Sequence, residues 1–335
     1  WLTLYHWDLP AALPGGWTNR ATVDAFVTYA ETVGRKLGDR VKHWITFNEP
    51  WVSAFLGYYE GVHAPGVKDL TKAVHAAHHL LLAHGRSVPV LRAASSGAQV
   101  GITLNLHPVH PATPSAADKA AARTHDGYAN RWFLDPVFGR GYPADMHNVL
   151  GRRLPAGAAA DTKEIAAPID FLGVNYYFPA FTRAAPGTDL GFQGLSPAEL
   201  AARGHELTTM GWPVVPCAFF ELLTRLNDDY APQSMYITEN GAASPDQVVG
   251  GRVDDPQRIA YLEGHLRAVQ QAICAGVPLR GYFLWSLMDN FEWAFGYTQR
   301  FGIVFTDYAT QTRIPKSSFH YYKGVIAANA LSSTR

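Results

Sequence analysis

The sequence has few cysteines, no excess of either charge and no long apolar run. Its 335 residues include only Cys217 and Cys274, and their apolar or helical surroundings lead us to expect buried free thiols rather than disulfides. Lys plus Arg and Asp plus Glu both total 28, so neither a nucleic acid nor a membrane surface is a predicted partner. No run approaches the length of a membrane span, and the N-terminus does not resemble a signal peptide. We therefore expect a soluble, cytoplasmic protein.

Short strands alternate with helices along the whole chain, which predicts an α/β protein with a parallel sheet. Two arrangements fit this alternation: a (β/α)8 TIM barrel that lacks its first two strand–helix units, and a doubly wound sheet. We expect residues 1–335 to form a single, incomplete barrel domain. The predicted strands are 2–5, 43–47, 99–106, 170–175, 234–238 and 281–285, and the predicted helices are 21–37, 71–85, 116–133, 216–226, 254–275 and 317–328.

The stretch "SMYITENGAA" places a carboxylate, Glu239, at the end of an apolar strand, followed by the turn formers Asn240 and Gly241. Such a residue can simply reach solvent, because carboxylates are rarely buried without partners. The second strand, however, also ends on polar residues, Asn48 and Glu49, in "WITFNEP". In a parallel barrel all strands end on one face, so the two glutamates are expected to meet there.

Other strand ends add aromatic and amide side chains to the same face. Aromatic rings stack on the C–H faces of a sugar, and carboxylates and amides bind its hydroxyls. Paired acids are also what the cleavage of a glycosidic bond requires. The strand-end residues concerned are His6, Trp7, Asn175, Tyr177 and Trp285, and the loop "MDNFEWAFGYTQRFG" adds Glu292 and Trp293.

Six motifs occur in order: "YHWDLP", "TFNEP", "GVHAPG", "DFLGVNYY", "YITENG" and "LWSLMDNFEW…RFG". Together they resemble family-1 glycoside hydrolases of the β-glucosidase type, from residue 1 to about 325. The resemblance implies a (β/α)8 barrel and a retaining double displacement without cofactor or metal. It also implies that Glu49 is the general acid/base and Glu239 the nucleophile, with carboxyls about 5–5.5 Å apart.

The resemblance further implies roles for the surrounding residues. Asn48 would bind the sugar 2-hydroxyl, Tyr177 would hydrogen-bond Glu239 and help to keep it ionised, and Trp51 would contact the aglycone. A glutamate at position 49, rather than glutamine, indicates an enzyme that uses an acid catalyst. The remaining substrate-binding residues are His6, Trp7, Asn175, Trp285, Glu292 and Trp293.

The expected substrate is a small unphosphorylated β-D-glucoside or oligosaccharide, or the related β-galactosides and β-fucosides. A carboxylate at Glu292 would repel a 6-phosphate. The helical His75, His78 and His79 lack the glutamate of a metalloprotease motif, so we expect packing rather than a metal site. Asp289 is predicted to fix the loop that carries Glu292.

The family begins with two further strands, which supply a sugar-binding Gln and an Arg beside the nucleophile, and this sequence does not contain them. Three readings stay open: a fragment of an active enzyme, a barrel completed by an N-terminal fragment or a homo-oligomer, and an inactive barrel that only binds carbohydrate. A transglycosylase is a further alternative. The tail "ANALSSTR" does not resemble the absent strands.

Overall fold

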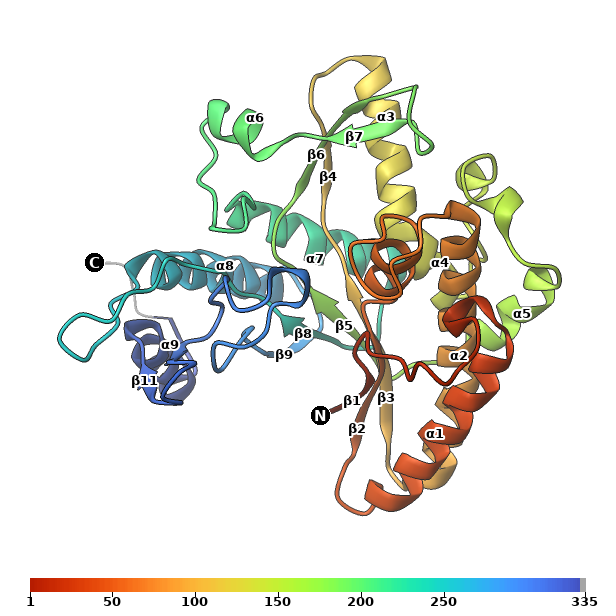
Figure 1. The fold of residues 1–335 in the computed structure, drawn as a ribbon, viewed down its shortest axis with the longest axis horizontal. Helices are drawn as coiled ribbons and strands as arrows, with labels where there is room; N and C mark the ends of the chain where they lie inside the picture. The colour runs from red at the N-terminus through yellow and green to blue at the C-terminus, as the bar shows by residue number, and fades with distance from the viewer. Residues whose placement is uncertain (332–335) are drawn as a thin grey trace.

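The computed structural model describes residues 1–331, so the last four residues of the predicted domain, 332–335, lie outside the described part. Six strands form one sheet in which every neighbouring pair is parallel and the spatial order follows the chain order (Figure 1). A doubly wound sheet reverses its strand order at a switch point, and this sheet does not. The strands are β1 (Leu2–Tyr5), β2 (His43–Asn48), β3 (Gln99–Asn105), β5 (Phe171–Asn175), β8 (Met235–Glu239) and β9 (Leu279–Tyr282).

The sheet is strongly curved, as a barrel wall must be. Trp1 directly precedes β1, which is an edge strand of the sheet. Its ring centroid lies 4.3 Å from that of Tyr236 on β8 and 4.9 Å from that of Phe171 on β5. Only β2 pairs with β1, so these contacts cross the concave side of the sheet. The predicted TIM-barrel architecture is confirmed, with six successive strand–helix units.

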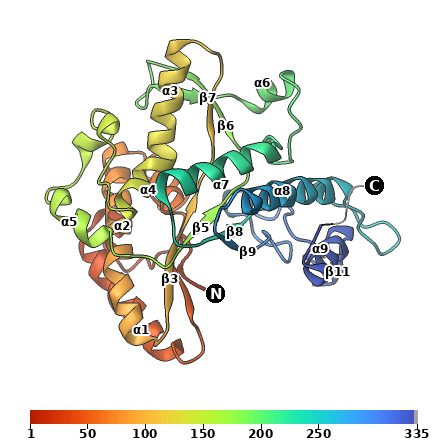
Figure 2. The same cartoon turned by 180° about the vertical axis from the view of Figure 1, so that it is seen from behind.

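Helices cover the outer side of this sheet (Figures 1 and 2). α1 and α2 lie together beside β1–β3, and α7 and α8 lie together beside the second half of the sheet. The apolar core lies mainly between the strands and these helices. The helices are α1 (Ala21–Leu37), α2 (Leu70–Ala94), α3 (Ala116–Asp126), α4 (Trp132–Val137), α5 (Ala158–Ile165), α6 (Pro197–Ala202), α7 (Pro216–Tyr230), α8 (Pro256–Cys274) and α9 (Ser317–Ala328).

The long loops form two small sheets of their own, which the sequence did not predict. β4 (Val109–Pro111) pairs with β6 (Ala180–Ala184), and β6 pairs with β7 (Phe192–Gly194). β10 (Val304–Thr306) and β11 (Arg313–Pro315) form an antiparallel pair after β9. Both sheets follow the carboxyl ends of barrel strands, so they add walls on the face where a barrel builds its site.

Several element boundaries differ from the predicted ones. The helix expected to end at residue 85 continues to Ala94, because the buried residues Val88 and Leu91, on either side of Pro89, extend its packed face. The helix expected over 116–133 is interrupted by a π-helical segment, Gly127–Arg131. The last barrel strand lies earlier than predicted, at Leu279–Tyr282.

The prediction that both cysteines are buried is wrong. Cys217 and Cys274 are free thiols, and both are exposed. Cys217 lies two positions before the buried Phe219 of α7, which turns it by roughly 200° to the opposite helix face. Cys274 is the last residue of α8, where the helix leaves the core.

The histidines of α2 pack against neighbouring elements. His78 hydrogen-bonds Asp161 and Tyr142, and His79 Nδ1 hydrogen-bonds the carbonyl of Trp17. Among residues 1–331 no cluster of three or more metal-binding side chains was found, and no helix there is long and apolar enough to cross a bilayer.

The close packing of α2 against α5 at Gly85 predicts how a substitution there changes stability. A Cβ at this position in α2 would lie 2.0 Å from the carbonyl oxygen of Glu164 in α5. We expect Gly85→Ala to lower the free energy of unfolding by about 2 kcal/mol, because one helix must move. Gly324 in α9 has no atom within 4 Å of its added Cβ, so Gly324→Ala should instead stabilise by up to about 1 kcal/mol. Urea unfolding of both variants tests this, and equal effects would contradict it.

Candidate active site

A cavity of about 330 Å³ lies at the carboxyl ends of the barrel strands. Its walls come from the segments that follow β1, β2, β5, β8 and β9, as the strand-end pattern predicted. Asn48 is the one predicted site residue that does not line it. The predicted residues in its wall are His6, Trp7, Glu49, Trp51, Asn175, Tyr177, Glu239, Trp285, Glu292 and Trp293.

The two glutamates are almost fully buried and are held by different donors. Glu49 is 5% exposed, and its Oε1 accepts a 2.6 Å hydrogen bond from Asn175 Nδ2. Glu239 is 9% exposed, and its Oε2 accepts a 2.7 Å hydrogen bond from the Tyr177 hydroxyl. Thr238 donates to Asn175 Oδ1 at 2.6 Å, which fixes the amide with its NH2 group toward Glu49.

Burial dominates the electrostatics of this pair. It raises the pKa of Glu49 to about 7, with a further increase from the charge of Glu292, while the hydrogen bond from Asn175 opposes the shift. Burial and the charge of Glu49 raise the pKa of Glu239, against the hydrogen bonds from Tyr177 and Asn175. Two neighbouring carboxylates in a dry site are not both ionised easily, so near neutral pH the pair favours holding one proton.

Side-chain hydrogen bonds connect residues at the ends of β1, β2 and β5. Asn175 Nδ2 also donates to Asn48 Oδ1 at 3.0 Å, and Asn48 Nδ2 lies 3.1 Å from His6 Nε2. An amide nitrogen can only donate, so His6 accepts at Nε2 and carries its proton on Nδ1. Burial lowers the pKa of His6 to about 4, which keeps the ring neutral.

Aromatic rings form one side of the cavity. Trp293 lies 4.7 Å from Trp7 and stacks on His6 at 5.9 Å between ring centroids. Trp7, Glu49 and Trp293 all have positive φ angles, of 73°, 49° and 45°. Such strained conformations in non-glycine residues cluster at functional sites.

The third carboxylate, Glu292, faces the same cavity. Burial raises its pKa to about 7, and a hydrogen bond with Trp285 opposes that shift. Its Oε2 is buried and has no hydrogen-bond partner within residues 1–331. An unpaired buried acceptor is costly, and a ligand hydroxyl could satisfy it.

Asn240 and Gly241 do not form the turn expected after β8. Asn240 is fully buried; its amide nitrogen donates to the carbonyl of Tyr176, and its Oδ1 accepts from the hydroxyl of Tyr282. A Cβ on Gly241 would lie 1.8 Å from the carbonyl oxygen of Trp285. The two residues therefore allow the segments after β8 and β9 to approach each other closely.

Several cavity residues were missed by sequence reasoning. Asn105 ends β3, so the strand-end pattern could have identified it. The others come from short helical segments and irregular loops outside the strands of the barrel sheet. Examples in the wall are Glu60, His63, His107, Phe178, Met210, Trp212, Phe295 and Phe301.

A β/α barrel with a buried pair of carboxylates in an aromatic-walled cavity has the architecture and equipment of a glycosidase. The sequence profile described as glycosyl hydrolase family 1 matches residues 1–331. The chain belongs to this family.

Similar proteins support the assignment over nearly the whole chain. A 1,4-beta-D-glucan glucohydrolase from Thermotoga neapolitana is 45% identical over 99% of this chain and 74% of its own length. A bifunctional beta-D-glucosidase/beta-D-fucosidase from Bifidobacterium breve is 41% identical over 97% of this chain and 74% of its own. The structure of a beta-glucosidase from Thermotoga maritima in complex with deoxynojirimycin matches with a TM-score of 0.94 and 42% identity. The match covers 98% of this chain and 74% of the Thermotoga chain.

The burial of the site predicts a pH-dependent effect of Asn175→Asp. The new carboxyl would lie beside Glu49 in a dry site, so its folded pKa should exceed its unfolded value of about 3.9. A raised carboxyl pKa costs stability above the unfolded pKa, and the cost grows with pH until the folded pKa is reached. The loss relative to wild type should therefore grow by about 2 kcal/mol between pH 5 and pH 7.5.

Urea unfolding at both pH values measures this difference. The exposed Asn148 provides a matched control, because Asn148→Asp should change stability by less than about 0.5 kcal/mol at either pH. A loss for Asn175→Asp that is the same at both pH values would contradict the account.

Proposed function

We propose that this protein is a retaining β-glycosidase that hydrolyses unphosphorylated β-D-glucosides, and that residues 1–335 belong to its single catalytic domain. The observation that carries the proposal is the burial of Glu49 and Glu239 in one sugar-sized cavity, where Asn175 donates to Glu49 and Tyr177 donates to Glu239. Cavities of this kind place two carboxyls on opposite sides of one glycosidic bond.

In the first step, ionised Glu239 attacks the anomeric carbon and Glu49 gives its proton to the leaving oxygen. The carbon–oxygen bond to the aglycone breaks, and an ester bond between the sugar and Glu239 forms. The hydroxyl of Tyr177 stabilises the carboxylate of Glu239 before the attack. The pKa of about 7 for Glu49 suits a group that is protonated at the start and must then release its proton.

In the second step, Glu49 is a carboxylate and acts as a general base. It takes a proton from a water molecule, whose oxygen attacks the anomeric carbon and releases Glu239. Two inversions at one carbon give net retention of configuration. The bond from Asn175 keeps the Glu49 carboxyl in place in both protonation states.

The other cavity residues provide a binding site for the sugar. We propose that Glu292 and His6 bind its hydroxyls and that Trp285 and Trp293 contact its ring. Asn48 would act at the 2-hydroxyl from behind the wall, and Trp51 would contact the aglycone. The names of the Thermotoga and Bifidobacterium relatives support glucosides first and fucosides second.

The two proposed roles predict different kinetics for the two glutamate variants. Glu239→Ala should lose at least about 10³-fold in kcat/KM on every aryl β-glucoside, because no nucleophile remains. Glu49→Ala should lose about 10²- to 10⁴-fold on phenyl β-glucoside, whose leaving group needs a proton. On 2,4-dinitrophenyl β-glucoside its first step should be nearly unchanged, because that phenolate leaves without protonation.

Rapid measurement of the dinitrophenolate burst separates the first step from the second. Product analysis with an added alcohol distinguishes hydrolysis from glycosyl transfer. An equal loss for Glu49→Ala on both substrates would overturn its role as the acid, and an inert wild type that still binds deoxynojirimycin would indicate a carbohydrate-binding barrel instead.

A further inference from the structure

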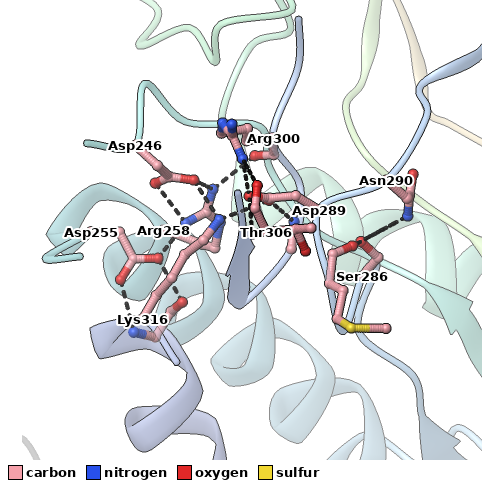
Figure 3. Close-up of polar contacts among 12 residues, drawn as sticks. Asp246, Asp255, Arg258, Ser286, Asp289, Asn290, Arg300, Thr306 and Lys316 are labelled. Carbon is pink, nitrogen blue, oxygen red and sulfur yellow. Dashed lines mark hydrogen bonds and ion pairs between the residues drawn. The ribbon is translucent and has the colours of Figure 1, made fainter. Parts of the chain in front are cut away.

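Figure 3 shows a network of charged side chains, none of which is among the residues that line the cavity. Lys316 is fully buried, and its Nζ bonds Asp246 Oδ2 at 2.5 Å and Asp289 Oδ1 at 2.9 Å. Arg258, 1% exposed, pairs with Asp246 at 2.7 Å and also with Asp255. Together with Arg300, which pairs with Asp289 at 2.6 Å, the network contains three cations and three carboxylates.

Asp289 is the member of this network that organises the loop after β9. Its Oδ1 accepts from Lys316 and from the backbone N–H of Gly302 at 3.0 Å, and its Oδ2 accepts from Arg300 and from the backbone N–H of Thr306 at 3.3 Å. This carboxylate, together with backbone hydrogen bonds such as that from the N–H of Asp289 to the carbonyl of Val304, holds the outgoing half of the loop against its returning half. The sequence prediction that Asp289 fixes this loop agrees with these contacts.

The part of the loop that carries Glu292 is also held by a backbone hydrogen bond from the N–H of Glu292 to the carbonyl of Gly296, and the neighbouring Trp293 packs on Trp7. Leu287 and Phe291, on either side of Asp289, are 59% and 52% exposed, so their packing adds little. Asp289 itself is 4% exposed and lies three residues before Glu292. Within residues 1–331 one oxygen of the Glu292 carboxylate has no partner, so the direction of this carboxylate depends on its hydrogen bond with Trp285 and on the backbone that carries it.

We propose that Asp289, supported by Lys316, is a positioning residue that aims Glu292 into the sugar site. This inference rests on the proposed function only in taking Glu292 as a sugar-binding group. The strength of a charged hydrogen bond depends steeply on the positions of its two groups. A binding group that is misplaced by about 1 Å therefore loses much of its contribution to affinity. An asparagine at position 289 would keep one acceptor oxygen. Its NH2 group would face two hydrogen-bond donors that now bond the second oxygen of Asp289, so those two bonds would be lost.

The test is a double-mutant cycle in the intact protein between Asp289→Asn and Glu292→Gln, with the dissociation constant of deoxynojirimycin measured by calorimetry. Asp289→Asn alone should weaken binding about tenfold, the scale of a lost charged hydrogen bond. In the Glu292→Gln background the same change should cost less than about threefold, because the group that it positions is gone.

Asp255→Asn is the matched control. Asp255 is as deeply buried in the same network, but it bonds Arg258 and Ser318 at the start of α9 rather than the Glu292 loop. The Asp255→Asn variant should lower the midpoint of thermal unfolding, as Asp289→Asn does. It should nevertheless change the dissociation constant of deoxynojirimycin less than about twofold.

Two results would overturn the inference: Asp289→Asn costing as much affinity with Gln at position 292 as with Glu, or Asp255→Asn weakening binding as much as Asp289→Asn. If Asp289→Asn does not fold, the charge-balanced pair Lys316→Met with Asp289→Asn replaces it in the same cycle. Because the readout is binding, it is separate from hydrolysis: an inert wild type with intact coupling would contradict the proposed reaction but not the positioning role.

Discussion

Two carboxyl groups buried within one small cavity set the conditions for the rest of this structure. Each loses hydration that fixed hydrogen-bond donors replace. Burial raises the pKa of both carboxyls, and the charge of Glu49 raises that of Glu239 further. The donors are therefore as much part of the site as the acids. Asn175 donates to Glu49 and Tyr177 donates to Glu239, whose pKa a hydrogen bond from Asn175 also lowers. The two acids consequently differ in their partners, although their chemical identity is the same.

The barrel makes these donor positions possible, because its curvature lets side chains of non-neighbouring strands hydrogen-bond to each other. Asn48 ends β2 and Asn175 ends β5, and β3 lies between these strands, yet the two amides bond at 3.0 Å. Only a curved sheet brings side chains of non-neighbouring strands together. In the loop after β9, outside the barrel sheet, buried ion pairs between Lys316 and Asp289 add to the backbone hydrogen bonds with β10. Rigid strands thus fix the acid pair, and a buried ion network fixes the loop.

The parts of the fold that follow from periodicity and strand ends could be predicted from the sequence, and so could most residues of the candidate site. β1, α1 and α9 have the predicted boundaries, and the glutamates lie where two apolar strands end. Features that depend on partners distant in sequence could not be predicted. Asn240 resembles a turn residue, but tyrosines from three other segments enclose it. The same reason explains the loop residue Trp212 in the cavity wall, which has no local signal. The exposure of Cys217 follows instead from the helix period, which places it opposite the buried Phe219.

The division of labour between the two glutamates is the central claim, and trapping the covalent intermediate tests it most directly. A 2-deoxy-2-fluoro β-glucoside with a dinitrophenolate leaving group should accumulate the sugar ester, because fluorine destabilises the oxocarbenium-like transition states of both steps while the good leaving group favours the first. Peptide mass spectrometry should then find one sugar per protein, attached to Glu239. A sugar attached to Glu49, or no attached sugar in a protein that still turns over the unsubstituted glucoside, would contradict the account.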